Sequence, residues 1–271
     1  MQQILRNTAF TMEVRVYQGS TLTDLAADPT VAVVDDQGTV VSAGAVTKPG
    51  GTTGTYQATI AAVTALTTLT ATWSGTLVGN PITIETTYEV VGTHLFSLAD
   101  LKAVSGLSAE TDGRLAAARL AVCDEFGSWC GIDFIPRPRY DILDGSGTDT
   151  LWLSRSRPTA LVAVEIDGVA QSLVDMDLYE YGALKVAGSW TPGNRNTEVF
   201  YEAGYDRPPS DVARVAIIRA ADQILGDSNT ISSRAMGSTN EFGNIRFASY
   251  KPTGLPDVDA VLERYRRPQV R

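Results

Sequence analysis

The side chains best suited to metal or redox chemistry are few. The sequence holds two cysteines, Cys123 and Cys130, and a single histidine, His94, in 271 residues. A zinc site built from Cys and His takes about four such ligands, and these three match none of the usual spacings. Two turns of a predicted helix would separate the cysteine Cα atoms by about 10 Å, too far for a disulfide. We therefore expect two buried thiols, no metal site and no cofactor.

Carboxylates close together in sequence are the other candidates for chemistry. The pairs Asp175/Asp177 and Asp257/Asp259 each enclose one apolar residue, and residues 144–149 read Asp-Gly-Ser-Gly-Thr-Asp. The second pair lies at a predicted helix start, where carboxylates stabilise the helix dipole. Residues 144–149 lack the glutamate and the spacing of an EF-hand loop. Solvated carboxylates, helix capping and a turn explain these residues better than a cation site or an acid–base pair.

Motifs for nucleotide or acyl chemistry are absent from the sequence. It contains no GxxxxGK[ST] or GxGxxG loop and no GxSxG elbow, and a Ser-His-Asp triad would have to be built around His94. The four Trp residues are scattered over different predicted elements, as is usual for core packing. The sequence therefore predicts interaction surfaces, and we expect that the protein is not an enzyme.

Net charge limits the classes of partner. The 22 basic and 31 acidic residues give a net charge of −9, which argues against a surface that grips nucleic acid by neutralising phosphates. No apolar stretch approaches the length of about 18 residues that a transmembrane helix needs, and no secretory signal is evident. These features predict a protein that folds in a cytoplasm and has no membrane partner.

The composition changes near residue 92. Residues 1–92 carry three basic and seven acidic residues and are rich in Thr, Val, Ala and Gly, while residues 93–271 carry the other 19 and 24. Short segments in which apolar and polar residues alternate, each ending in turn residues, predict strands in the first part. Such a series of six or seven strands predicts a small β-sandwich of immunoglobulin-like type. The predicted strands are 10–17, 31–35, 40–46, 55–60, 67–74 and 82–91.

Residues 93–271 predict a second domain, which mixes helices with a small antiparallel β region, so the fold class of the chain is α+β. Ser97 resembles the first residue of a capping box, Gly131 a helix C-cap, and Asp167-Gly168 the turn of a β-hairpin. One predicted helix begins at Ser97, and three others cover about 108–130, 212–225 and 256–267. The predicted strands are 139–143, 151–153, 161–166, 184–186 and 198–201.

The segment 227–256 predicts a long loop, because Gly, Ser, Asn and Thr occur throughout it. Its aromatic residues are too many for a plain linker, so it is a candidate inter-subunit segment. The chain then ends in a predicted helix and a basic tail, which we expect to dock on a partner. The candidate interface residues are Phe242, Ile245, Arg246, Phe247, Tyr250, Arg264, Tyr265, Arg266 and Arg267.

From about residue 96 onward, the order of the elements resembles the head-to-tail adaptor, or connector, proteins of long-tailed bacteriophages. The resemblance rests on an ordered set of segments that covers about 175 residues, and none of them is diagnostic alone. These segments are 97–102 (SLADLK), 151–158 (LWLSRSRP), 162–168 (VAVEIDG), 199–205 (VFYEAGY) and the helix start at Pro208, Pro209 and Asp211.

The resemblance implies a ring of copies of this chain, typically twelve, beneath the portal of the DNA-filled head, in the neck of a virion assembled in the host cytoplasm. Such adaptors join the portal protein to the next neck ring or the tail terminator protein. DNA passes through the lumen without specific binding, and the C-terminal segment docks on the portal. Residues 1–92 depart from the short adaptors of the family and resemble an added immunoglobulin-like domain on the outside of the ring.

An alternative function is that of another virion or cell-surface binding protein. The N-terminal sandwich would then bind a glycan or a receptor, and the rest of the chain would be a scaffold. Exposure of Trp73 or Tyr56 on a concave face would favour this alternative, since exposed aromatic rings stack on sugars.

Overall fold

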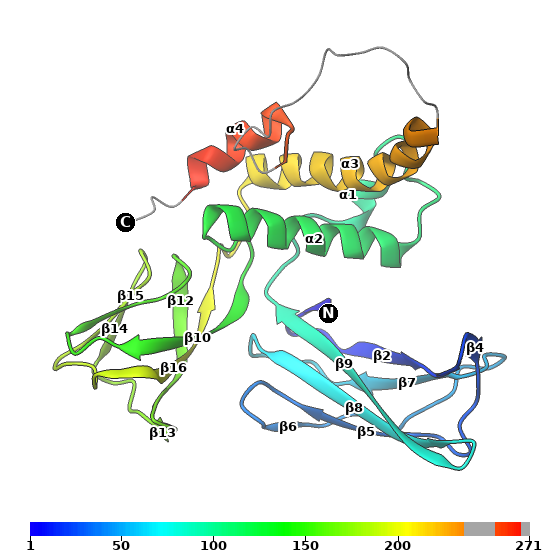
Figure 1. Cartoon of the computed structure of the whole chain (residues 1–271), viewed down its shortest axis with the longest axis horizontal. Helices are drawn as coiled ribbons and strands as arrows, with labels where there is room; N and C mark the ends of the chain where they lie inside the picture. The colour runs from blue at the N-terminus through cyan, green and yellow to red at the C-terminus, as the bar shows by residue number, and fades with distance from the viewer. Residues whose placement is uncertain (236–252, 267–271) are drawn as a thin grey trace. The chain divides into compact units, whose positions relative to one another are not determined.

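The chain divides into two compact units, Met1–Gly92 and Thr93–Arg271, and this division falls at the change in composition. The computed structural model describes residues 1–235 and 253–266, with side chains at 1–226 and 253–266 (Figure 1). Within these residues, the first unit contains strands only, and the second combines helices with strands. The α+β class predicted from the sequence is therefore confirmed.

Two sheets dominate the first unit (Figure 1). The larger sheet has the strand order β1-β9-β8-β5-β6, in which β1 runs parallel to β9 and the other pairs are antiparallel. The smaller sheet pairs β2 with β7, and bridges from Ala43 and Thr47 to β7 extend it. The strands are β1 (Gln2–Leu5), β2 (Phe10–Arg15), β3 (Tyr17–Gln18), β4 (Thr21–Leu22), β5 (Thr30–Val34), β6 (Val40–Val41), β7 (Thr55–Ile60), β8 (Thr68–Leu77) and β9 (Asn80–Val91).

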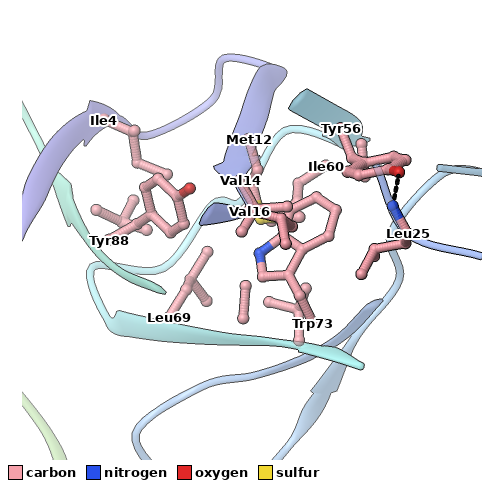
Figure 2. Close-up of a cluster of buried hydrophobic side chains, with 14 residues drawn as sticks. Ile4, Met12, Val14, Val16, Leu25, Tyr56, Ile60, Leu69, Trp73 and Tyr88 are labelled. Atoms are coloured by element: carbon pink, nitrogen blue, oxygen red, sulfur yellow. Dashed lines mark hydrogen bonds between the residues drawn. The ribbon is translucent and has the colours of Figure 1, made fainter. Parts of the chain in front are cut away.

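The core of the first unit lies between these two sheets (Figure 2). Met12 and Ile60 come from the smaller sheet and Trp73 from the larger one, and all three are almost fully buried. The polar ends of the buried rings have partners: Trp73 Nε1 donates to Thr86 Oγ1 (3.2 Å), and Tyr56 Oη accepts from the Leu25 backbone N–H (2.8 Å). Alternation along β7 and β8 thus places one side of each strand inward, as the sequence predicted.

Four helices occur in the described residues of the second unit, and side-chain caps precede the first two of them, whereas the last begins at Pro256 without one. Ser97 Oγ accepts from the Asp100 N–H (3.0 Å), which confirms the predicted cap. Thr111 caps the next helix, so that helix begins later than residue 108, and Gly131 is its C-cap as predicted. The helices are α1 (Leu98–Lys102), α2 (Asp112–Cys130), α3 (Ser210–Ala235) and α4 (Pro256–Tyr265).

The prediction of a loop from residue 227 is wrong for residues 227–235, because α3 continues through Ala235. Polar and β-branched residues in this stretch weaken a helix only by fractions of a kcal/mol each, and neither Gly nor Pro occurs between Asp227 and Met236. A helix already anchored by its first four turns can therefore extend across them. The remainder of the predicted loop, 236–252, lies outside the described residues.

Two antiparallel sheets form the β part of the second unit. One has the order β10-β16-β12-β13 and the other the order β11-β15-β14. Apolar side chains of both sheets meet in one core, around Leu151, Leu184 and Val199. The strands are β10 (Arg137–Gly145), β11 (Thr150–Trp152), β12 (Pro158–Ile166), β13 (Val169–Ala170), β14 (Met176–Tyr179), β15 (Ala183–Val186) and β16 (Gly193–Ala203), which include all five predicted strands.

The predicted hairpin turn at Asp167-Gly168 is confirmed. Ile166 pairs with Val169 across it, and both turn residues have positive φ, 51° and 74°. Asn or Asp followed by Gly tolerates this left-handed backbone, and the resulting turn matches the twist of the two strands. Local sequence therefore sets the register of β12 and β13.

A buried polar cluster connects the two sheets. The Asp141 carboxylate of β10 accepts from Ser154 N–H (2.7 Å), Ser154 Oγ (2.6 Å) and Tyr201 Oη of β16 (2.9 Å). Burial, followed by the nearby Asp141 charge, raises the pKa of the Tyr201 phenol. Tyr201 therefore remains a neutral donor, and the buried carboxylate is solvated by protein groups.

We predict that Gly204→Ala destabilises the second unit by at least about 2 kcal/mol. Gly204 has a φ of 124°, and an added Cβ would collide with the carbonyl of Ile135. Gly188→Ala is the matched control, because its Cβ would meet no atom within 4 Å. Urea unfolding of both variants measures the difference, and equal midpoints would contradict the predicted collision.

Candidate functional site

The C-terminal helix α4 carries the candidate interface residues that the structure describes. Its inward face buries Val258, Val261 and Leu262 against the second unit. Asp259 is also buried, and its Oδ1 accepts from Thr253 N–H (3.1 Å) and Thr253 Oγ1 (2.7 Å). The expectation of a solvated or capping carboxylate is wrong at Asp259, because this side chain fixes the loop that leads into the helix.

Tyr265 is half-buried and is held against the second unit by several contacts. Its hydroxyl donates to Asp211 Oδ1 (2.9 Å) at the start of α3. Its ring packs edge-on against Phe134 (5.5 Å between centroids) and Tyr205 (6.4 Å). Burial and the hydrogen bond to Asp211 raise the pKa of Tyr265 to about 12. The structure thus places this predicted interface residue in an intramolecular contact between α3 and α4.

The two arginines beside Tyr265 differ in how firmly they are held. The Arg266 guanidinium lies over the Trp129 ring (4.7 Å) and near Glu263 (3.8 Å). The Arg264 side chain is 68% exposed, and its ion pair with Asp211 is long (3.8 Å). Of the three predicted interface residues in the described chain, Arg264 is therefore the most accessible to a partner.

The other predicted interface residues lie outside the described residues. They are Phe242, Ile245, Arg246, Phe247, Tyr250 and Arg267.

The prediction of two buried thiols is confirmed. Cys123 and Cys130 are both buried, and neither forms a disulfide. Cys130 Sγ contacts the Leu262 carbonyl (3.5 Å), and burial raises the pKa of this thiol to about 12. A thiol with so high a pKa is a poor nucleophile, which agrees with a packing role between α2 and α4.

The single histidine is half-buried at the start of the second unit. His94 Nδ1 has no hydrogen-bond partner in the described part of the chain. Burial, and to a lesser extent the charge of Arg119, lowers the pKa of His94 to about 4. Arg119 is itself buried and donates from Nη1 to the Phe96 carbonyl (3.1 Å). His94 is therefore neutral in the folded protein at pH 7.

The described residues contain neither a cluster of metal ligands nor a membrane-spanning helix. Within 1–235 and 253–266, no three or more His, Cys, Asp and Glu side chains gather as they would around a metal ion. No described helix is both long enough and apolar enough to span a bilayer.

Two exposed aromatic surfaces were missed by the sequence analysis. One is formed by Trp152, Tyr179 and Tyr181 on the three-stranded sheet, and the other is centred on Tyr140 and Phe200 on the four-stranded sheet. Alternation in β11 and β14 identifies outward positions for Trp152 and Tyr179. The pairing of these strands through β15, which brings the rings together, is not evident from the sequence.

Comparison with known proteins gives no family assignment. No family model matches the chain, and no curated protein matches it. Among solved structures, it is similar to a DUF4785 family protein from Legionella pneumophila subsp. pneumophila str. Philadelphia 1, with 10% identity and a TM-score of 0.25. That match covers 78% of this chain and 47% of the Legionella protein, so the chain spans about half of its length. A similarity at this level supports no argument about fold or function.

We predict that His94 makes the second unit lose stability as the pH falls from about 6.5 to about 4. In this window the unfolded chain binds a proton at His94 that the folded chain excludes, so protonation favours unfolding. The slope should reach at most about 1.4 kcal/mol per pH unit.

The measurement compares urea unfolding of wild type and His94→Gln at several pH values. His94 is the only histidine, so the substitution removes all histidine titration. The variant should show a flatter profile above about pH 5, where most carboxylates are still ionised. Parallel profiles for the two proteins would contradict the assignment.

Proposed function

We propose that this chain is a head-to-tail adaptor of a tailed bacteriophage virion. In this proposal, copies of the chain form a ring, typically a dodecamer, beneath the portal and join the DNA-filled head to the next neck ring or tail terminator protein. DNA passes through the central channel without specific binding. The protein has a structural role and no catalytic one.

The observation that carries the proposal is the order of elements in the second unit. A capped helix and a long helix precede an antiparallel β region, and the last strand, β16, leads through Pro208 and Pro209 into the long helix α3. The resemblance to adaptor proteins predicts the elements in this order. The segment 154–157 contacts the end of α2, since Arg155 Nη1 donates to the Gly127 carbonyl (2.6 Å). This motif thus has a definite role in connecting the β region to the helices.

The first unit fits an added immunoglobulin-like domain. Its β6-β5-β8-β9 order and the separate β2–β7 pair, which enclose one core, support two facing sheets of that type. It has no Cys…Trp…Cys pattern, so it is not a true immunoglobulin domain. We assign it to the outside of the ring, as a decoration that leaves the channel free.

The acidic character of the chain suits a channel for moving DNA. A basic lumen would bind phosphates and slow passage, whereas the net charge of −9 offers no general phosphate-binding surface. The basic residues at the end of the chain, including the exposed Arg264, are instead available to an acidic surface on the portal.

The burial of Trp73 and Tyr56 argues against the alternative, in which the sandwich binds a glycan or a receptor. Trp73 is 2% exposed and Tyr56 is 1% exposed, and both belong to the core in Figure 2. Neither ring can stack on a sugar without opening that core.

We predict that negative-stain electron microscopy of the protein mixed with its cognate portal shows annular particles stacked on the portal. Removing residues 267–271 together with Arg264→Gln should weaken this docking, because it removes the basic side chains to which the proposal assigns the contact with the portal. Deleting all of 257–271 is unsuitable as a test, since it would remove Val258, Val261 and Leu262 from the core.

Arg15→Gln provides the matched control, because Arg15 is similarly exposed and also has one carboxylate neighbour. It should dock like the wild type. Compact wild-type particles that never bind the portal would overturn the adaptor proposal. Normal docking by the tail variant would overturn only the assignment of the tail.

A further inference from the structure

Three aromatic rings form an exposed cluster on the three-stranded sheet, which we term the aromatic platform. Trp152 and Tyr179 lie on either side of Ala183 in the register of β11, β15 and β14. Tyr181, from the turn between β14 and β15, packs against both, with ring centroids 5.8 Å from Trp152 and 5.4 Å from Tyr179. The Lys185 ammonium lies over the Tyr179 ring at 5.6 Å.

The platform exposes more aromatic surface than packing within this unit requires. Trp152 is 59% exposed and Tyr181 is 50% exposed, although both rings already touch other aromatic rings. Trp and Tyr are the residues that most often anchor protein interfaces, because they bury large areas at a low cost in conformational entropy. A contiguous cluster of such side chains marks an interaction site.

The four-stranded sheet exposes a second surface, which combines apolar side chains with carboxylates and which we term the acidic face. Tyr140 stacks on Phe200 (4.6 Å), and Ile142 and Val162 extend the surface along β10 and β12. Tyr140, Ile142 and Val162 are all exposed. Three glutamates lie among these residues on outward positions of β12 and β16, namely Glu165, Glu198 and Glu202.

The aromatic platform and the acidic face point away from each other. Leu151 and Leu184 of the three-stranded sheet and Val164 and Val199 of the four-stranded sheet share one buried core. Neighbouring residues along a strand face opposite sides of the sheet. Trp152, next to Leu151, and the outward residues of β16 therefore lie on the two outer faces of a two-layer structure.

The charges on the two surfaces are complementary. In the described chain, none of the three glutamates takes part in an ion pair, and Tyr140 Oη donates to Glu198. Lys185 likewise lies over a ring and is in no ion pair within the described residues, although Asp177 is its cross-strand neighbour. A cation beside aromatic rings on one surface thus matches carboxylates beside aromatic rings on the other.

We infer that the occupant of both surfaces is a second copy of this chain, with the aromatic platform of one copy seated on the acidic face of the next. Two different, complementary surfaces on opposite sides of one unit are what a head-to-tail contact requires, and repetition of that contact closes a ring when the rotation between copies allows it. This inference rests on the proposed ring and names the surfaces that build it.

The test uses two full-length variants that each lose one surface. The platform variant is Trp152→Thr/Tyr181→Ser, and the face variant is Tyr140→Thr/Val162→Thr. Tyr17→Ser is the control, since Tyr17 is an exposed ring of the first unit that belongs to neither surface. Circular dichroism and thermal unfolding establish that all the variants fold.

Each variant alone should lose ring formation on the portal, and its self-association in sedimentation velocity should weaken at least about tenfold, because it lacks two interface anchors. An equimolar mixture of the two should form dimers that grow no further. The platform variant still has an acidic face and the face variant still has a platform, so a single intact contact forms between them. The Tyr17 control should assemble like the wild type.

Unchanged assembly by either variant would overturn the inference and leave the adaptor proposal standing. Continued dimerisation of the face variant alone would also overturn it, since it would indicate platform-to-platform contact. Retained assembly together with binding of the platform to a glycan array would assign the platform to a carbohydrate instead.

A second readout separates this contact from the adaptor proposal. A photo-crosslinking amino acid replaces Tyr181 in the full chain, and ¹⁴N and ¹⁵N copies are mixed at high concentration without portal. Crosslinks between copies to peptides covering 137–145, 158–166 or 193–203 would support the inference even if the portal is not bound. Crosslinks confined to other regions would overturn it.

Discussion

The buried carboxylate of Asp141 is the interaction on which the second unit depends. It accepts from Ser154 and from Tyr201, and so ties β10, the segment after β11 and β16 to one point. An ionised group buried without such donors would cost several kcal/mol. The three donors therefore fix one arrangement of the two sheets, because any shift of one strand past another would leave the carboxylate without partners.

This fixed arrangement extends into the helices. Directly after Ser154, Arg155 donates to the Gly127 carbonyl, and Ser156 N–H donates to the Gly131 carbonyl (3.4 Å) at the end of α2. The Gly127 carbonyl also accepts from the Gly131 N–H (2.9 Å), so Arg155 is its second donor, and Gly131 is the C-cap that ends the helix. A short segment thus holds the sheets against α2, which in turn contacts α3 through the Arg219–Glu125 ion pair. The aromatic platform, the acidic face and α4 are consequently parts of one framework.

The sequence predicts features that depend on neighbouring residues and misses those that depend on distant ones. Ser97, Gly131 and the Asp167-Gly168 turn were predicted correctly, because capping and hairpin turns are decided within a few residues. The end of α3 was misplaced because polar and β-branched residues lower helix propensity only slightly, and a helix that has already formed can extend through them. The contact of Tyr265 with Asp211, 54 residues earlier, and the gathering of Trp152 with Tyr181 depend on tertiary structure, which periodicity does not encode.

The two proposed contact surfaces point in opposite directions, so growth of the assembly must be limited as well as favourable. A head-to-tail contact whose rotation does not close produces open filaments. The net charge of −9 opposes such growth among free copies, because each added copy brings the same excess of carboxylates. In the proposed contact, Glu165, Glu198 and Glu202 add carboxylates to one of the two surfaces, and the single Lys185 of the neighbouring copy would offset only part of their charge. A template that holds copies at a fixed radius would supply the missing free energy and set the rotation, and the proposed function gives this role to the portal.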